Sequence, residues 1–221
     1  MRVVIRGAGD LASGVALRLW RAGMDVVLLD VEKPTAIRRT VAFSEAIVHG
    51  EQTVEDVTAR LAAAETAEET LAAGYIPVLV DPEGRSVPKL KPDALVDAIL
   101  AKRNLGTEIR DAPVVIGVGP GFTAGVDCHA VVETMRGHSL GRVIREGSAI
   151  PNTGVPGLIG GFAGERVLRA PAAGLFHPLR DIGDAVTEGE ILATVEGKPI
   201  IATLTGTLRG ILPEGTEVSP G

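Results

Sequence analysis

The residues best suited to chemistry in this sequence lie in a glycine-rich stretch near its start. Gly7, Gly9 and Ala12 have the spacing G-x-G-x-x-[G/A], and Asp30 ends the next apolar run. In such a motif the first glycine allows a tight turn, the second lets a phosphate approach the backbone, and the third small residue lets a helix pack on a strand. Free N–H groups at the helix start favour an anion, and a carboxylate placed like Asp30 accepts hydrogen bonds from a ribose diol. The pattern predicts a site for a nucleotide or phosphate, which we assign to Gly7, Ala8, Gly9, Asp10, Leu11 and Asp30.

An alternative for the same motif is a tight turn that binds nothing, as found in many doubly wound folds. Asp10 favours this alternative, because a carboxylate in the loop repels phosphate unless it caps the helix or binds a sugar hydroxyl.

A second glycine loop contains Gly119 and Gly121 and follows the apolar run 114–118. Ligands bind at the carboxyl ends of parallel strands. We therefore expect the two glycine loops to flank one crevice, with Gly119 and Gly121 closing its far side. A purely structural bend at Pro120 is the alternative.

The side chains after the second loop give no catalytic assignment. Cys128 and His129 are neighbours, so on a strand they point to opposite faces. We expect Cys128 to be a small buried hydrophobe, with catalysis as the alternative. The four histidines show no metal-ligand spacing, so we predict no metal site. The cations Arg136, Arg142 and Arg145 are either a support for an anionic ligand or solubilising charge.

The elements that position these residues begin with a βαβ unit: a strand at 3–5, a helix at 10–21 and a strand at 26–29. Capping boxes predict helices starting at Thr53 and Thr66. The sequence also predicts four further strands and one further helix. These are strands at 76–80, 114–118, 126–133 and 140–144, and a helix from Pro92 to Asn104.

The last part of the sequence is predicted to be all β. Two stretches about 32 residues apart resemble each other, and together they resemble the halves of a biotinyl/lipoyl-type barrel-sandwich hybrid. Lys198 occupies the hairpin position, but without flanking methionines, so we interpret it as a hairpin residue and not as a modified carrier lysine. The fold class is therefore α/β, with a Rossmann-like parallel sheet over 1–165 and a small all-β module over 166–221.

Composition narrows the class of protein. The chain has 221 residues, 45% of them hydrophobic and 23% charged, with a net charge of −6 and no basic track, so nucleic acid is not an expected partner. No apolar run is long enough to cross a bilayer and no signal peptide is visible. The single cysteine allows no internal disulfide. We expect a cytoplasmic protein that does not act at a membrane; homo-oligomer formation is left open.

Several stretches together resemble one family along nearly the whole chain. They are 5–14 (IRGAGDLASG), 34–46 (PTAIRRTVAFSEA), 119–125 (GPGFTAG), 133–138 (ETMRGH) and 152–157 (NTGVPG). They resemble the accessory proteins of selenium-dependent molybdenum hydroxylase systems. These are similar in role to xanthine dehydrogenase accessory factors, which carry a Rossmann domain and help to load a molybdenum cofactor.

The resemblance implies a maturation role, with a molybdenum hydroxylase or its cofactor-loading machinery as partner. It identifies no catalytic residue. The candidate ligands are a molybdopterin-type cofactor, whose dinucleotide form also carries a pyrophosphate and a ribose, or NAD. The alternatives are an NAD-dependent oxidoreductase, which Asp30 supports, and a non-catalytic scaffold with a degenerate Rossmann domain.

Overall fold

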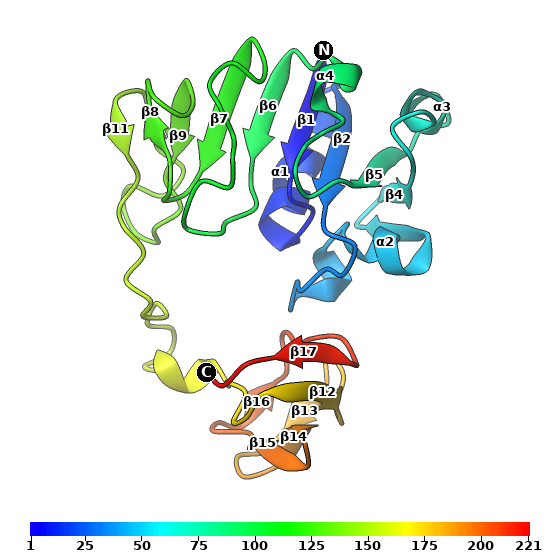
Figure 1. Cartoon of the computed structure of the whole chain (residues 1–221). Helices are drawn as coiled ribbons and strands as arrows, with labels where there is room; N and C mark the ends of the chain where they lie inside the picture. Colours follow the sequence, from blue (N-terminus) through cyan, green and yellow to red (C-terminus); the bar gives the residue numbers. More distant parts are fainter. The chain divides into compact units, whose positions relative to one another are not determined.

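The computed structural model describes residues 1–221 and divides into two compact units (Figure 1). The first contains residues 1–34 and 41–152, and the second contains 35–40 and 153–221. The structure thus divides the chain at 152/153, earlier than the expected 165/166, and it places a short N-terminal segment in the second unit. The α/β class is confirmed.

The first unit is built on one nine-stranded sheet, in the order β10-β9-β7-β6-β1-β2-β5-β4-β3. The seven strands from β9 to β4 are parallel to their neighbours, and β10 and β3 add antiparallel edges. The strands are β1 (Arg2–Arg6), β2 (Asp25–Asp30), β3 (Glu51–Val54), β4 (Val57–Leu61), β5 (Ile76–Val80), β6 (Ala94–Asp97), β7 (Val114–Val118), β9 (Ala130–Val132) and β10 (Val143–Ile144). A separate antiparallel pair joins β8 (Thr123–Ala124) to β11 (Gly147–Ser148).

Two apolar cores form because successive strand residues face opposite sides of the sheet. Val3 and Ile5 of β1 pack with α1 (Asp10–Arg21), while Val4 belongs to the other core. That second core also takes residues from α3 (Ala67–Ala72) and α4 (Val87–Leu90). The short α2 (Glu45–His49) contributes to the α1 side. No helix of the structure is both long and apolar enough to cross a membrane.

The predicted βαβ unit and the predicted helix after Thr66 are present. The helices predicted after Thr53 and over 92–104 are absent. The residues after Thr53 form the hairpin β3–β4, in which the hydroxyls of Thr53 and Thr58 lie 2.8 Å apart across the strands. The stretch 92–104 contains β6, which is buried on both faces. A continuous apolar run of this kind fits a buried parallel strand as well as a helix, and the sheet decides between them.

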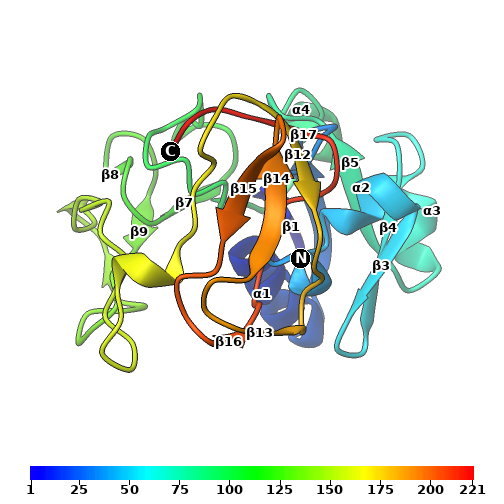
Figure 2. The same cartoon turned by 90° about the horizontal axis from the view of Figure 1, so that it is seen from below.

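The second unit contains two antiparallel sheets (Figure 2). One has the order β15-β14-β12-β17, and the other pairs β13 with β16. Their bounds are β12 (Gly174–Pro178), β13 (Ala185–Val186), β14 (Ile191–Val195), β15 (Lys198–Ile201), β16 (Gly206–Thr207) and β17 (Thr216–Val218). A small core forms around Phe176, Val195 and Ile211.

The internal repeat appears as reciprocal strand pairing. Gly174 pairs with Val218, and Val186 pairs with Gly206. Gly174 therefore pairs with the repeat equivalent of Val186, and Val186 pairs with the repeat equivalent of Gly174, as in a pseudo-two-fold arrangement. Lys198 opens β15 directly after the β14–β15 turn, in agreement with its interpretation as a hairpin residue.

The segment 35–40 belongs to the second unit although the chain on either side of it lies in the first. The Ile211 N–H donates to the Ile37 carbonyl at 2.8 Å, and the Arg39 side chain donates to the Ile211 carbonyl at 3.1 Å. The sequence did not predict this docking.

Candidate functional site

The candidate site lies at the point in the sheet where the strand order reverses. From β1 the chain adds β2 and β5 on one side, and later adds β6, β7 and β9 on the other. In open α/β sheets this reversal opens a crevice at the carboxyl ends of the strands, where ligands bind. The first glycine loop follows β1 and the second follows β7, at the same edge of the sheet.

The start of α1 offers unused backbone donors. Gly9 is the N-cap in an extended conformation, no side chain caps the helix, and the first helical bond runs from Ser13 N–H to the Gly9 carbonyl. The N–H groups of Gly9, Leu11 and Ala12 have no acceptor in the protein. Together with the helix dipole, these donors favour an anion at this end of α1.

The two glycines of the first loop have different surroundings. Gly7 has φ +99°, and a Cβ there would lie 2.8 Å from the Ala98 carbonyl oxygen, so this position requires glycine for the fold. Gly9 has φ −66°, which any residue adopts, and a Cβ there would have nothing within 4 Å. The fold therefore does not require glycine at position 9, and the space beside it is open.

Asp30 lies directly against this loop. Its carboxylate accepts the Ala8 N–H and the Val31 N–H, each at 2.7 Å. Burial raises the pKa of the Asp30 carboxyl, and these two hydrogen bonds oppose the rise. The structure thus brings Asp30 and the glycine loop together as the sequence predicts, although one loop amide, that of Ala8, is already taken by Asp30.

Leu11 and Asp10 lie in the first turn of α1. Of Leu11, 47% is exposed, whereas the buried face of the helix consists of Ala12, Ser13, Ala16 and Leu17. The exposure of Leu11 leaves an apolar side chain at the mouth of the candidate site.

A second support of the loop comes from residues that the sequence did not single out for this role. The Ser44 N–H donates to the Ala8 carbonyl at 2.9 Å, and the Ser13 hydroxyl donates to the same carbonyl at 3.1 Å. The Ser13 hydroxyl also accepts the Phe43 N–H at 2.8 Å. A serine on the buried face of α1 was the available signal, because a buried hydroxyl needs a partner.

The second glycine loop packs against the chain that follows β6. A Cβ at Gly121 would lie 2.7 Å from backbone atoms of Arg103, and one at Gly119 would lie 3.3 Å from Leu100 Cδ2 and 2.8 Å from Thr134 Oγ1. Since Gly7 meets Ala98, one segment, 98–104, runs past both glycine loops. Gly119 and Gly121 are therefore brought to the same edge as Gly7 and Gly9 with this segment between them.

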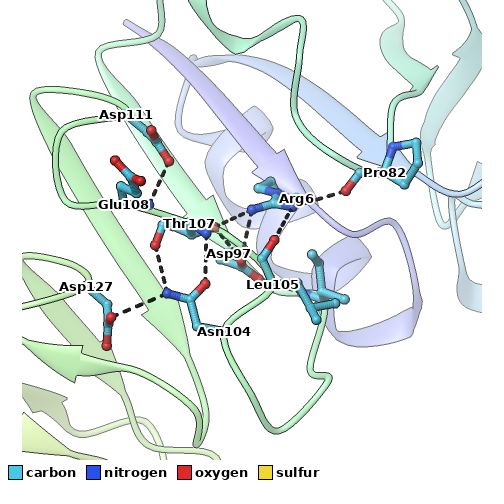
Figure 3. Close-up of polar contacts among 10 residues, drawn as sticks. Arg6, Pro82, Asp97, Asn104, Leu105, Thr107, Glu108, Asp111 and Asp127 are labelled. Atoms are coloured by element: carbon cyan, nitrogen blue, oxygen red, sulfur yellow. Dashed lines mark hydrogen bonds and ion pairs between the residues drawn. The ribbon is translucent and has the colours of Figure 1, made fainter.

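A buried polar cluster lies at the carboxyl ends of β1 and β6 (Figure 3). Arg6 and Asp97 end the paired strands β1 and β6, and their side chains are 4% and 2% exposed. Their nearest charged atoms are 3.7 Å apart, and the Thr107 hydroxyl bridges them, accepting from Arg6 and donating to Asp97, each at 2.6 Å. Arg6 also donates to the carbonyls of Pro82 and Leu105. The sequence analysis missed this cluster, because the stretch containing Asp97 was interpreted as a helix.

The remaining candidates have structural partners. Cys128 is fully buried, and burial raises the pKa of its thiol, which disfavours the nucleophilic thiolate. His129 Nδ1 accepts the Val115 N–H at 2.9 Å, and Asp127 accepts the Thr123 N–H at 2.7 Å. The buried Glu133 accepts the Met135 and Ile150 N–H groups; burial pushes its pKa up, but these donors and the Thr134 N–H bring it below its ordinary value. No three His, Cys, Asp or Glu side chains are grouped so that they can hold a metal ion.

Comparison with known proteins gives one strong sequence relative. No family model matches the chain. The chain is 57% identical over 220 residues to the uncharacterized protein YqeB of Escherichia coli K12, a match that covers 99% of this chain and 41% of YqeB. The chain thus spans about two fifths of the length of this relative. A solved structure of an aspartoacylase family protein from Mesorhizobium loti matches 96% of this chain and 62% of its own, with 11% identity and a TM-score of 0.22.

Proposed function

We propose that this chain is an accessory protein of a selenium-dependent molybdenum hydroxylase system, and that its first glycine loop binds a nucleotide or a molybdopterin-type ligand. Five sequence stretches carry the family resemblance, and three of them contribute to the candidate site: 5–14, 34–46 and 119–125. The observation that carries the binding proposal is the open space at Gly9 beside three unused N–H groups, with the Asp30 carboxylate against the same loop.

The order of the strands supports a Rossmann-like assignment of the first unit. When the hairpin β3–β4 is left out, the remaining parallel strands β1, β2, β5, β6, β7 and β9, numbered along the chain, take the spatial order 3-2-1-4-5-6, which is that of Rossmann folds. The hairpin β3–β4 extends this sheet beyond β5. In this assignment the phosphate lies at the start of α1 and the ribose lies near Asp30.

The reciprocal pairing in the second unit supports the barrel-sandwich hybrid assignment. Lys198 has no flanking methionines and lies within β15, so we assign no carrier role to it. We propose instead that this unit contacts the partner, a molybdenum hydroxylase or its cofactor-loading machinery.

An NAD-dependent oxidoreductase remains the second candidate, because Asp30 suits the ribose of NAD. The acidic groups at the neighbouring strand ends, Asp97 and Glu133, are buried and held by hydrogen bonds. Neither is thereby available as a general acid or base, which favours a binding role over this chemistry.

The binding proposal is tested with Gly9→Ala. A Cβ at position 9 meets no protein atom, so the variant should fold, but the methyl group occupies the space in which a phosphate would approach. Wild type should gain about 2.7 kcal/mol of stability from adenine nucleotides or pterin compounds at about 100 times Kd. Thermal shift and native mass spectrometry should show that this gain is lost in the variant.

Gly14→Ala is the matched control, because Gly14 lies in α1 and a Cβ there also meets nothing. It should keep the ligand-induced shift and gain up to about 1 kcal/mol of helix stability. The binding proposal fails if no compound stabilises the wild type, or if Gly9→Ala responds as the wild type does.

A further inference from the structure

We propose that Lys102 and Arg103 form a second anion subsite, which binds a further negatively charged group of the ligand whose first phosphate lies at the start of α1. This inference rests on the proposed function and narrows its ligand class to compounds with at least two anionic groups, of the diphosphate or dinucleotide type.

The first support is the position of the segment that carries the two cations. The 98–104 segment leaves β6 at the reversal of the sheet and touches the first glycine loop at Gly7 and the second at Gly121. The backbone of Arg103 itself makes the contact with Gly121. Arg103 therefore lies beside the second loop, at the carboxyl edge of the sheet, and Lys102 directly precedes it in the chain.

The second support is the backbone conformation. Leu100 and Lys102 have φ of +62° and +63°, in the left-handed region that residues with a Cβ rarely adopt. A residue with a Cβ is strained in this conformation, and the strain persists only where the surroundings enforce it. Two residues with positive φ, Leu100 and Lys102, within three positions imply that this segment is held in one conformation, which fixes the backbone position of Lys102.

The third support is the anchor at the base of the segment (Figure 3). The Asn104 side chain makes two hydrogen bonds to the Thr107 backbone. Its amide nitrogen donates to the Thr107 carbonyl at 2.7 Å, and its amide oxygen accepts the Thr107 N–H at 2.8 Å. Thr107 in turn joins the buried pair Arg6 and Asp97. The exposed part of the segment is therefore joined through Asn104 and Thr107 to a buried polar cluster. Such an anchor holds a binding group in place before the ligand arrives.

The fourth support is unpaired charge. Lys102 and Arg103 are exposed, and neither side chain has an ion-pair or hydrogen-bond partner, whereas exposed cations such as Arg60, Arg110 and Arg180 are paired with glutamates. The acids near these strand ends are engaged: Asp97 with Thr107, and Asp127 with Thr123. Two free cations thus lie at the same edge of the sheet as the start of α1, which itself suits one phosphate.

The test measures binding of AMP, ADP and inorganic pyrophosphate by calorimetry at low and high salt. Lys102→Ala/Arg103→Ala should weaken ADP binding by about 10-fold or more, because charge-assisted contacts are lost. AMP binding should change less, and the salt dependence of ADP binding should flatten. The control Arg18→Ala/Lys198→Ala removes the same charge from positions outside the 98–104 segment and should bind ADP as the wild type does.

The outcomes separate the two proposals. ADP binding that is equal in the wild type and in Lys102→Ala/Arg103→Ala overturns the second subsite and leaves the proposed function standing. If the wild type binds neither nucleotide, the nucleotide form of the proposed function fails and pyrophosphate decides the subsite. Pyrophosphate binding that depends on Lys102 and Arg103 supports it, and pyrophosphate binding that is absent or unchanged overturns it.

Discussion

Glycines with the same motif spacing have unlike roles. Gly7 is required by a close approach of the Ala98 carbonyl and by its positive φ, whereas Gly9 is required by neither. Gly121 resembles Gly7, because the backbone of Arg103 fills the place of its side chain. The sequence predicts where the glycines lie, but the reason for each depends on neighbours distant in the chain.

From the raised pKa of Asp30 we predict how its contribution to the free energy of unfolding changes with pH. Because the folded carboxyl holds its proton more tightly than the unfolded one, with an ordinary value of 3.8, Asp30 favours the fold at low pH. This contribution is lost as the pH rises through the raised pKa. The free energy of unfolding of wild type minus that of Asp30→Asn should therefore fall as the pH rises from 3.8 through the raised pKa. Urea unfolding across this range measures it.

Asp81 provides the control with the opposite sign. Burial alone would raise its pKa, but the Ser86 hydroxyl and the N–H groups of Ser86 and Arg85 lower it. Its contribution is present above pH 3.8 and is lost below it, so the corresponding difference for Asp81→Asn should grow as the pH rises. A flat or rising difference for Asp30→Asn would contradict the assignment of Asp30 as a buried carboxyl.

At the scale of elements, the sequence predicts the segments whose patterns are local. The unit β1–α1–β2 follows from a glycine loop between two apolar runs, and α3 follows from the acidic first turn after Thr66. The prediction of a helix over 92–104 was wrong, because the apolar residues of this stretch fit a helical period. It contains a strand, β6, because β1 and β7 pair with it in the sheet. Arg6 was missed because its partner Asp97 lies in that stretch.

The Arg6–Asp97 cluster ties the ends of β1 and β6 to the segment that follows β6. Removing one partner leaves the other as an uncompensated buried charge, so Arg6→Met or Asp97→Leu alone should cost about 3–5 kcal/mol. The double variant should cost clearly less than the sum of the two. A double-mutant cycle in urea measures this coupling.

Thr107→Val tests the bridging hydroxyl in the same cycle. It removes the group that lies between Arg6 and Asp97 but leaves both charges in place. It should destabilise the protein by about 1–3 kcal/mol, since two buried polar groups lose a partner. Strict additivity of Arg6→Met and Asp97→Leu would show that the two charges are energetically independent.

For the whole molecule, the sequence predicts a sheet unit followed by an all-β unit. The repeat of about 32 residues agrees with the two equivalent strand pairings, Gly174 with Val218 and Gly206 with Val186. It does not predict that 35–40 joins the second unit. That docking uses a backbone hydrogen bond between Ile37 and Ile211 and a bond from the Arg39 side chain to the Ile211 carbonyl, and both acceptors are backbone groups that every residue type carries.

Gly210→Ala tests this docking. A Cβ at position 210 would lie 2.8 Å from the Ile37 carbonyl oxygen, which is backbone and cannot swing away. The hydrogen bond from Ile211 should weaken, so we expect the Ile211 amide to exchange its hydrogen about 10-fold faster. Gly206→Ala is the control, because a Cβ there meets no atom within 4 Å, and it should leave the exchange of Ile211 unchanged.

The position of 35–40 also decides how the protein can be taken apart. A C-terminal fragment beginning at Thr153 would lack the stretch that covers Ile211, and an N-terminal fragment ending at Asn152 would carry that stretch with nothing to receive it. During synthesis Arg39 emerges 172 residues before the carbonyl it binds. The second unit is thus completed by residues made well before the rest of it, and no single cut yields two intact units.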